Sequence, residues 1–144
     1  MALSIRSATA VDIPSMHSIR LAVRENRLSD SAIGEGHYLP YVESGNAWVA
    51  ISENRIVGFA ALDVAGASVW ALFVDPACEG LGVGRVLQEQ VIAAATNHDL
   101  TRLELTTSPG TRAERFYKHT GWKPLEATEK GEIRFGLDLG QSGA

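Results

Sequence analysis

The chain carries a cluster of glycines directly after an apolar segment. The apolar run from Val69 to Val74 ends at Asp75-Pro76, and three alternating glycines with a following arginine come next: Gly80, Gly82, Gly84 and Arg85. Glycine lets the backbone adopt positive φ and approach a ligand closely. A helix that begins here would direct its free N–H groups and the positive end of its dipole at one point. Because such a point binds a pyrophosphate without a metal, the segment predicts a site for a phosphate-bearing cofactor.

Two common phosphate-binding motifs do not fit these glycines. The dinucleotide fingerprint needs a third glycine three residues after the second, but Arg85 or Leu87 occupies that position. The P-loop needs a Gly-Lys pair followed by Ser or Thr, and the chain contains none. For the glycines alone, a strand-to-helix turn without any ligand stays open.

The segment Glu79–Gly84 resembles a known acyl-CoA signature. It is similar to the Q/R-x-x-G-x-G/A pattern of the GNAT superfamily, whose members are acyl-CoA-dependent N-acetyltransferases. Glu79 stands where the family has Gln or Arg. Because an acid facing a pyrophosphate is unfavourable, we expect the Glu79 side chain to point away from the ligand.

A second segment, from Ala113 to Trp122, resembles the family pattern A-x-x-x-Y-x-x-x-G-F/W through Tyr117 and Gly121. In the family this helix follows a strand that splays from its neighbour and opens a slot for pantetheine, with the tyrosine near the sulfur of CoA. The asparagine often found seven residues before that tyrosine is Gly110 here. Taken alone, Phe116-Tyr117 would be an aromatic pair packed into a core.

The resemblance, which extends from about Ile5 to Leu139, implies binding roles for acetyl-CoA. The strand segment from Leu72 to Val74 would pair its backbone with pantetheine, a β-bulge there would aim those groups, and the Phe73 N–H would polarise the thioester carbonyl. Arg85 either pairs with a phosphate or is a solvated arginine. The implied cofactor-binding residues are Leu72, Phe73, Val74, Glu79, Gly80, Leu81, Gly82, Val83, Gly84, Arg85, Phe116 and Tyr117.

The implied reaction is direct acyl transfer from a thioester to an amine. The amine must lose a proton, the carbonyl oxygen must be stabilised, and the leaving thiolate needs a proton or a hydrogen bond. Tyr117 is the candidate for the third task. Proton transfer from a phenol to a thiolate is uphill by roughly 2 kcal/mol, which favours Tyr117 as a hydrogen-bond donor.

The general base and the acceptor pocket are not defined by a motif. Asp63, Glu104 and His37 are candidate bases, and a water chain to bulk solvent is an alternative. The predicted acceptor-pocket residues are Arg24, Glu25, Asn26, His37, Tyr38 and Trp70, with Glu132 and Arg134 as secondary candidates.

Two other chemistries are set aside. Cys78 precedes a helix start, which would lower a thiol pKa, but no histidine partner is suggested and the family transfers the acyl group directly. The four histidines, His17, His37, His98 and His119, lack metal-ligand spacing, so no metal is expected.

Composition limits the class of partner. A net charge of −4 over 144 residues gives no support for nucleic-acid binding, and no stretch reaches the roughly 20 apolar residues of a membrane helix. The one cysteine suits a reducing compartment, and the N-terminus resembles no signal peptide, so a cytoplasmic protein is expected. The expected acceptor is a small-molecule or peptide amine, with polyamines or aminoglycosides electrostatically compatible; a homodimer is possible.

The elements that position these residues alternate along the chain. Strands are predicted at 3–8, 47–52, 56–64, 67–74, 103–107, 122–125 and 132–139, and the strand at 67–74 is expected to be buried on both faces. Helices are predicted from Thr9 or Asp12 to Asn26, around 37–43, and at 82–97 and 111–120.

This order predicts an α+β (three-layer α/β) domain of the GNAT type. Its mixed sheet would hold about six to seven strands, with helices on both faces. Residues 1–139 would form the single domain, with 140–144 as a disordered tail. Two rivals to acetyl transfer remain: a catalytically silent acyl-CoA-binding or sensing module, and a transferase that uses a longer acyl-CoA.

Overall fold

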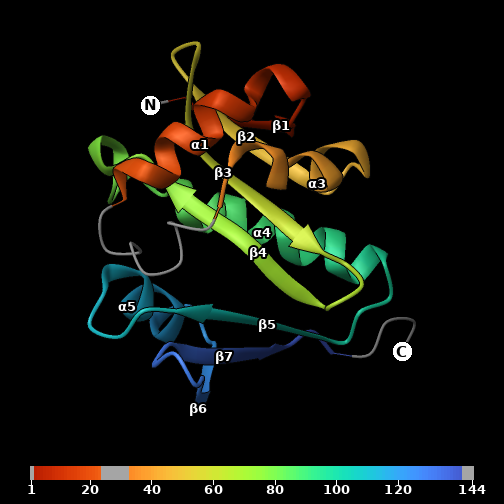
Figure 1. The fold of residues 1–144 in the computed structure, drawn as a ribbon, viewed down its shortest axis with the longest axis vertical. Coiled ribbons are helices and arrows are strands. Elements are labelled where there is room, and N and C mark those ends of the chain that lie inside the picture. The colour runs from red at the N-terminus through yellow and green to blue at the C-terminus, as the bar shows by residue number, and fades with distance from the viewer. Residues whose placement is uncertain (1, 24–32, 141–144) are drawn as a thin grey trace.

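One mixed sheet of seven strands organises the molecule. The computed structural model describes residues 2–23 and 33–140. The strand order is β1-β2-β3-β4-β5-β7-β6, and every neighbouring pair is antiparallel except β4 and β5 (Figure 1). The strands are β1 (Ser4–Ser7), β2 (Ala47–Ser52), β3 (Arg55–Asp63), β4 (Ser68–Val74), β5 (Arg102–Thr107), β6 (Lys123–Ala127) and β7 (Ile133–Asp138).

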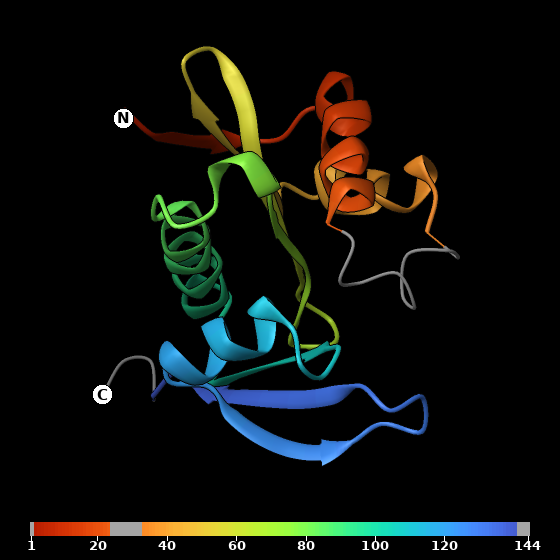
Figure 2. The ribbon, with the colours of Figure 1, turned by 90° about the vertical axis from the view of Figure 1, so that its left-hand side faces the viewer.

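Helices cover both faces of this sheet. The helix α1 (Ile13–Ala22), which follows the 3-10 turn η1 (Ala10–Asp12), and the short α3 (Leu39–Glu43), which follows η3 (Glu35–His37), lie on one face. The opposite face carries α4 (Val83–Asn97) and α5 (Arg112–His119), and Figure 2 shows α1 and α4 on opposite sides of the strands. The predicted mixed sheet with helices on both faces is therefore confirmed. Within the described residues, no helix is long and apolar enough to cross a membrane.

The observed elements follow the sequence pattern closely. β2 has the predicted bounds, and the other strands, α4 and α5 differ by one or two residues at their ends. The first helix ends at Ala22, and the extended ψ of 90° at Val23 stops it. The predicted continuation of this helix to Asn26 lies outside the described residues.

The strand β4 differs from its prediction. Only Ala71 and Phe73 are buried, and its other residues are half-buried. The cause is that β4 pairs with β5 only at Ser68 and Glu104, after which the two strands diverge into a fork (Figure 1). The prediction that β4 is buried on both faces is therefore wrong, because the fork leaves one side of the strand open.

The two helices of one face are attached to each other through a buried side chain of α4. The buried Gln88 of α4 accepts hydrogen bonds from the Trp122 indole Nε1–H at 3.0 Å and from the Thr120 hydroxyl at 3.1 Å. These bonds tie the end of α5 to α4, and the Tyr117 ring packs edge-on against Trp122. The tie fixes α5 at the side of the fork.

Candidate functional site

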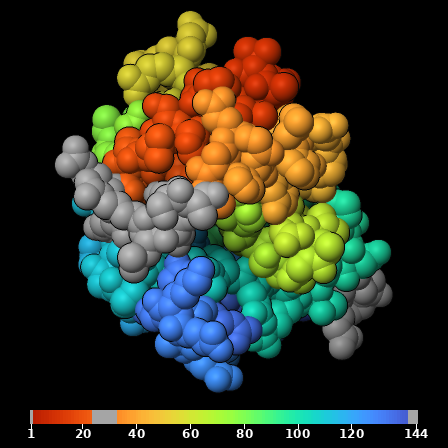
Figure 3. Space-filling view, viewed as in Figure 1, coloured from red at the N-terminus to blue at the C-terminus, as the bar shows by residue number. Residues whose placement is uncertain are grey.

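The fork contains a large cavity. Its volume is about 680 Å³, within the range typical of small-molecule sites. The space-filling view looks onto the helices α1 and α3, whose red and orange surfaces adjoin on the near face of the molecule (Figure 3). The cavity is lined by Ala22, Val23, Leu72, Phe73, Val74, Pro76, Cys78, Glu79, Gly80, Gly82, Val83, Gly84, Arg85, Arg112, Ala113, Phe116 and Tyr117.

The glycine loop turns the start of α4 toward this cavity. Asp75 caps the preceding turn η4 (Pro76–Cys78) by accepting the Ala77 N–H at 3.0 Å, and its carboxylate pairs with Arg55 at 3.3 Å. Gly80 and Gly82 then adopt φ of 79° and 86°, a region that favours glycine. With Gly82 as the N-cap, the first amides of this 15-residue helix converge at the cavity, where an anion would be stabilised.

The charged side chains around the loop form a partly neutralised set. Glu79 Oε2 lies 3.1 Å from the Arg112 guanidinium, and Arg85 also lines the cavity. Because Glu79 is itself a lining residue, the prediction that it points away is not confirmed, but its charge is paired with a cation. Leu81 is 54% exposed and does not line the cavity. Among the described residues that line the cavity, Arg85, Arg112 and Glu79 are the charged ones, and their formal charges sum to +1.

The pairing of β4 with β3 fixes which backbone groups face the fork. The Asp75 N–H donates to the Val57 carbonyl at 2.8 Å, and the same register pairs Phe73 with Phe59. In an antiparallel ladder, alternate pairs exchange hydrogen bonds and the pairs between them point outward. The Phe73 N–H is therefore directed at β3, which corrects the prediction that it faces the cofactor. The outward-pointing groups are those of Leu72 and Val74.

A β-bulge lies just upstream of these groups. The register shifts from Ala61 opposite Ala71 to Leu62 opposite Val69, so Trp70 is the extra residue on β4. Such a bulge bends the strand locally. A bulge is therefore present in β4, but it lies at Trp70 and not within the predicted segment from Leu72 to Val74.

Tyr117 lies where two cavities meet. It is 6% exposed, and its ring contacts Phe116, Trp122 and Phe135 at centroid distances of 5.3, 5.6 and 6.0 Å. Burial raises the pKa of its phenol well above the ordinary value, because ionisation would place a charge in an apolar setting. The phenol therefore stays protonated and can act as a hydrogen-bond donor.

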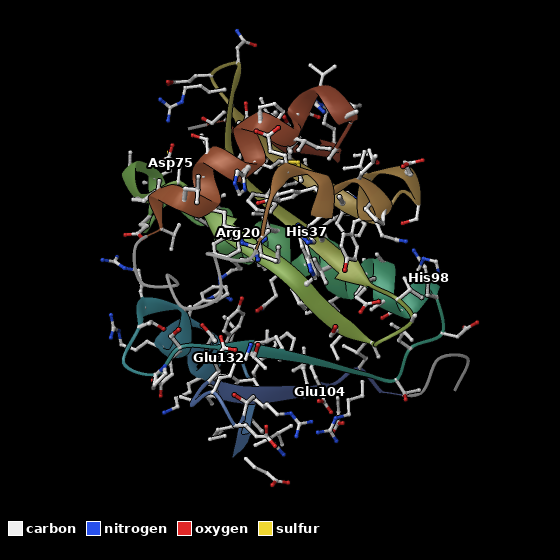
Figure 4. The ribbon with its side chains drawn as sticks, viewed as in Figure 1. Arg20, His37, Asp75, His98, Glu104 and Glu132 are labelled. Carbon is white, nitrogen blue, oxygen red and sulfur yellow. The ribbon has the colours of Figure 1, made fainter. Side chains whose placement is uncertain are left out.

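The second cavity is smaller, about 110 Å³, and crosses the fork toward the α1 face. It shares Leu72, Phe73, Ala113 and Tyr117 with the large cavity. Arg20 of α1 forms part of its wall and lies between α1 and β4 (Figure 4). The other lining residues are Val69, Trp70, Ala71, Leu105, Thr106 and Thr107.

Comparison with known protein families identifies the family of this chain. The family model of the acetyltransferase (GNAT) domain matches residues 31–135. The chain belongs to the GNAT acetyltransferase family. The match includes the glycine loop, the fork and the helix that carries Tyr117, and the family predicted from the two motifs is thereby confirmed.

Two proteins named as N-acetyltransferases are similar to this chain. Peptidyl-lysine N-acetyltransferase YjaB of Escherichia coli is 38% identical over 90 residues, which are 60% of this chain and 55% of that protein. Serotonin N-acetyltransferase 2, chloroplastic, of Oryza sativa is 28% identical over 125 residues, which are 81% of this chain and 59% of that protein. The chain thus spans somewhat more than half the length of these relatives.

The same fold is found in solved structures. The structure of yncA from Salmonella typhimurium, solved with its cofactor acetyl-CoA, has a TM-score of 0.81. It is 20% identical, and the similarity covers all of this chain and 98% of that one. At this level of identity the similarity establishes the fold.

The three candidate bases of this GNAT chain are engaged away from both cavities. Asp63 accepts the Gly66 N–H at 3.1 Å in the β3–β4 turn, and His37 Nδ1 accepts the Gly34 N–H at 2.9 Å. Glu104 pairs with Arg134, on the β5–β7 side of the fork (Figure 4). Since none of the three lines either cavity, the structure does not bring them to the site.

The predicted acceptor residues divide into three groups. Trp70 lines the second cavity, and the buried Tyr38 packs edge-on against it at 5.2 Å between ring centroids. Arg24, Glu25 and Asn26 lie outside the described residues. His37, Glu132 and Arg134 do not line either cavity.

Sequence reasoning missed two arginines of the site. Arg20 follows Ile13, Met16 and Ile19 on the buried face of α1, and a charge at that position was a detectable signal. Arg112 gave no such signal, because its place at the cavity depends on how α5 packs beside the glycine loop.

Proposed function

We propose that the chain transfers an acetyl group from acetyl-CoA to the amine of a small molecule or peptide. The observation that carries this proposal is the junction at Tyr117, where a cavity suited to a phosphate-bearing cofactor meets a second one on the α1 face. Two substrates that enter from the two sides would therefore meet at one buried phenol. The names of the relatives, a peptidyl-lysine and a serotonin N-acetyltransferase, support an amine acceptor.

The residues present fit the cofactor. The amides that follow Gly82, together with Arg85 and Arg112, would hold the pyrophosphate, with the helix dipole behind them. The outward backbone groups of Leu72 and Val74 would pair with the pantetheine amides, as an added strand does. When bound, acetyl-CoA supplies an acetyl group activated as a thioester.

The chain's own groups would then assist one displacement, in which a C–N bond forms and the C–S bond breaks. An outward amide of β4, from Leu72 or Val74, stabilises the carbonyl oxygen as negative charge develops on it. Tyr117 donates a hydrogen bond to the leaving sulfur. Because burial raises the pKa of Tyr117, the proton that finally neutralises the thiolate comes from water.

Proton removal from the amine is assigned to water. The described residues that line the second cavity include no carboxylate and no imidazole. An ammonium acceptor has no lone pair for attack, so its proton must leave before or during the reaction. Water that enters the cavity from solvent is the acceptor we propose.

The test is release of free thiol from acetyl-CoA in the presence of amines, amino acids, polyamines and peptides, with identification of the acetylated product by mass. Amine-dependent release with a matching N-acetyl product supports the transferase. Binding of acetyl-CoA, seen as a raised melting temperature, with no release for any amine would support the silent binding module instead. Release that rises with propionyl- or butyryl-CoA would identify a transferase of longer chains.

A further inference from the structure

A buried threonine at the end of β5 lines the second cavity. Thr107 is 4% exposed, and Tyr117 lines the same cavity. Side chains alternate between the two faces of a strand, so Thr107 lies on the same face of β5 as the buried Leu103 and Leu105. Within the described part of the chain, the Thr107 hydroxyl forms no hydrogen bond with another protein group.

A hydroxyl at this position is unfavourable unless a ligand uses it. A buried hydroxyl without a partner lowers stability, and a valine would have the same shape without that cost. The described side chains that line the second cavity carry oxygen atoms only at Thr106, Thr107 and Tyr117. Because the Tyr117 hydroxyl is assigned to the leaving sulfur and the Thr106 side chain is exposed on the other face of β5, Thr107 offers the buried oxygen that is left for the acceptor.

The backbone of β5 supplies a second oxygen to the same cavity. The Glu104 N–H donates to the Ala67 carbonyl at 3.0 Å, which is the β4 side of the strand. Backbone groups alternate in direction along a strand, so Thr106, two residues later, directs its N–H and C=O to the same side. Since β4 pairs with β5 only at Ser68 and Glu104, these groups of Thr106 face the fork and are not paired with β4.

We propose that the Thr107 hydroxyl and the Thr106 carbonyl accept the two N–H groups of a neutral amine, so that the preferred acceptors are primary amines. This inference rests on the proposed acetyl transfer and narrows its substrate class. With both N–H groups held on the β5 side, the nitrogen lone pair points across the fork toward β4, where the thioester would lie. Two hydrogen bonds thus fix the direction of attack.

The same two oxygens assist the reaction as it proceeds. The nitrogen lone pair becomes the new C–N bond, and the C–S bond breaks with its electron pair left on sulfur. Positive charge develops on nitrogen during attack, and the partial negative charges of the two oxygens stabilise it. The surplus proton on nitrogen goes to water, and the product amide keeps one N–H. A secondary amine has a single N–H, so one of the two oxygens would face its alkyl group instead.

The first arm of the test compares primary amines with their N-methyl derivatives in the unmodified protein. The pairs are glycinamide and sarcosinamide, benzylamine and N-methylbenzylamine, and a lysine peptide and its Nε-methyl-lysine form. Any other amine that reacts is paired with its own N-methyl form. Thiol release should give a kcat/KM about 10- to 100-fold higher for the primary member of each pair that reacts. An equal or higher kcat/KM for the secondary amines would overturn the inference.

The second arm removes the hydroxyl and keeps the shape of the side chain. Thr107→Val should lower kcat/KM for the primary amine by about 3- to 10-fold, as for one neutral hydrogen bond. It should leave the N-methyl amine little changed, because the single N–H of that amine bonds to the Thr106 carbonyl. The preference for primary amines should therefore shrink by the same factor. Thr107→Ser, which keeps the hydroxyl, should preserve most of the preference.

The matched control is Thr101→Val, at an exposed threonine just before β5 that lines neither cavity. It should leave the preference for primary amines unchanged. The KM for acetyl-CoA and the affinity for CoA, measured by calorimetry, should stay the same in all three variants. Retained binding of CoA also shows that each variant is folded.

The outcomes separate this inference from the function beneath it. No thiol release with any amine would overturn the proposed function. Thiol release with the same preference in Thr107→Val as in the unmodified protein would overturn the role of Thr107 while leaving acetyl transfer in place. If Thr107→Val does not fold, Thr107→Ala removes the same hydroxyl, and the same comparison decides.

Discussion

Replacing Gly82 by Ala tests whether the loop geometry creates the cofactor site. Gly82 has φ 86° and ψ 4°, and a Cβ placed there meets no atom within 4 Å, so any effect comes from backbone strain and not from a clash. A residue other than glycine in this region costs about 1–3 kcal/mol. If the loop keeps its shape, the free energy of unfolding falls by that amount. If the loop relaxes, the same energy is lost from binding, as a roughly 5- to 160-fold weaker affinity for CoA.

Gly84→Ala is the matched control, two residues away in the same loop. Gly84 is helical, and a Cβ there would lie 3.5 Å from the Phe116 ring, an ordinary contact. Alanine also favours a helix over glycine by up to about 1 kcal/mol. Calorimetric titration with CoA and urea unfolding should therefore show a loss in at least one assay for Gly82→Ala and in neither for Gly84→Ala. Equal behaviour of the two variants in both assays would refute the reasoning.

Three further predictions follow from the described contacts. Tyr117→Phe should lower kcat by about 10- to 100-fold with little change in KM for acetyl-CoA, measured by thiol release; an unchanged kcat contradicts the donor role. Gln88→Met should cost about 1–3 kcal/mol in urea unfolding, because the buried Trp122 N–H loses its acceptor; an unchanged midpoint contradicts this. Asp12, whose pKa the Arg6 guanidinium lowers to about 2, stabilises the fold above the unfolded pKa of 3.8. That contribution, on the order of 1–2 kcal/mol, is lost as the pH falls from about 4 to 2. The difference in stability from Asp12→Asn should therefore shrink over this range, and a constant difference would contradict the assignment.

The parts of the site that depend on short-range pattern could be predicted from the sequence. Gly80 and Gly82 indicate backbone positions with positive φ, because few other residues adopt that conformation. The apolar run before them indicates a strand. The helix with Tyr117 has its own cap, since Thr111 accepts the Glu114 N–H at 3.2 Å. Each of these signals lies within a few residues of the structure it specifies.

The rest depends on long-range packing. The period of β4 shows that its amides alternate, but only the register with β3 shows that Phe73 faces Phe59 and that Leu72 and Val74 face the fork. The half-buried state of β4 likewise depends on its divergence from β5 beyond Ser68. The apolar sequence of β4 alone predicts neither the direction of its amides nor its partial exposure, because both depend on how β3 and β5 pair with it.

The divergence of β4 and β5 also changes how many open borders the sheet has. A continuous sheet has two edge strands, here β1 and β6, and exposed edges are the usual sites of unwanted pairing between molecules. The fork adds two more strand edges inside the molecule, one on β4 and one on β5, although both strands lie in the middle of the sheet. A narrow interior edge can accept an extended ligand backbone while excluding a foreign strand. The sheet thus keeps unpaired backbone groups available to a ligand at a place where another protein molecule cannot pair with them.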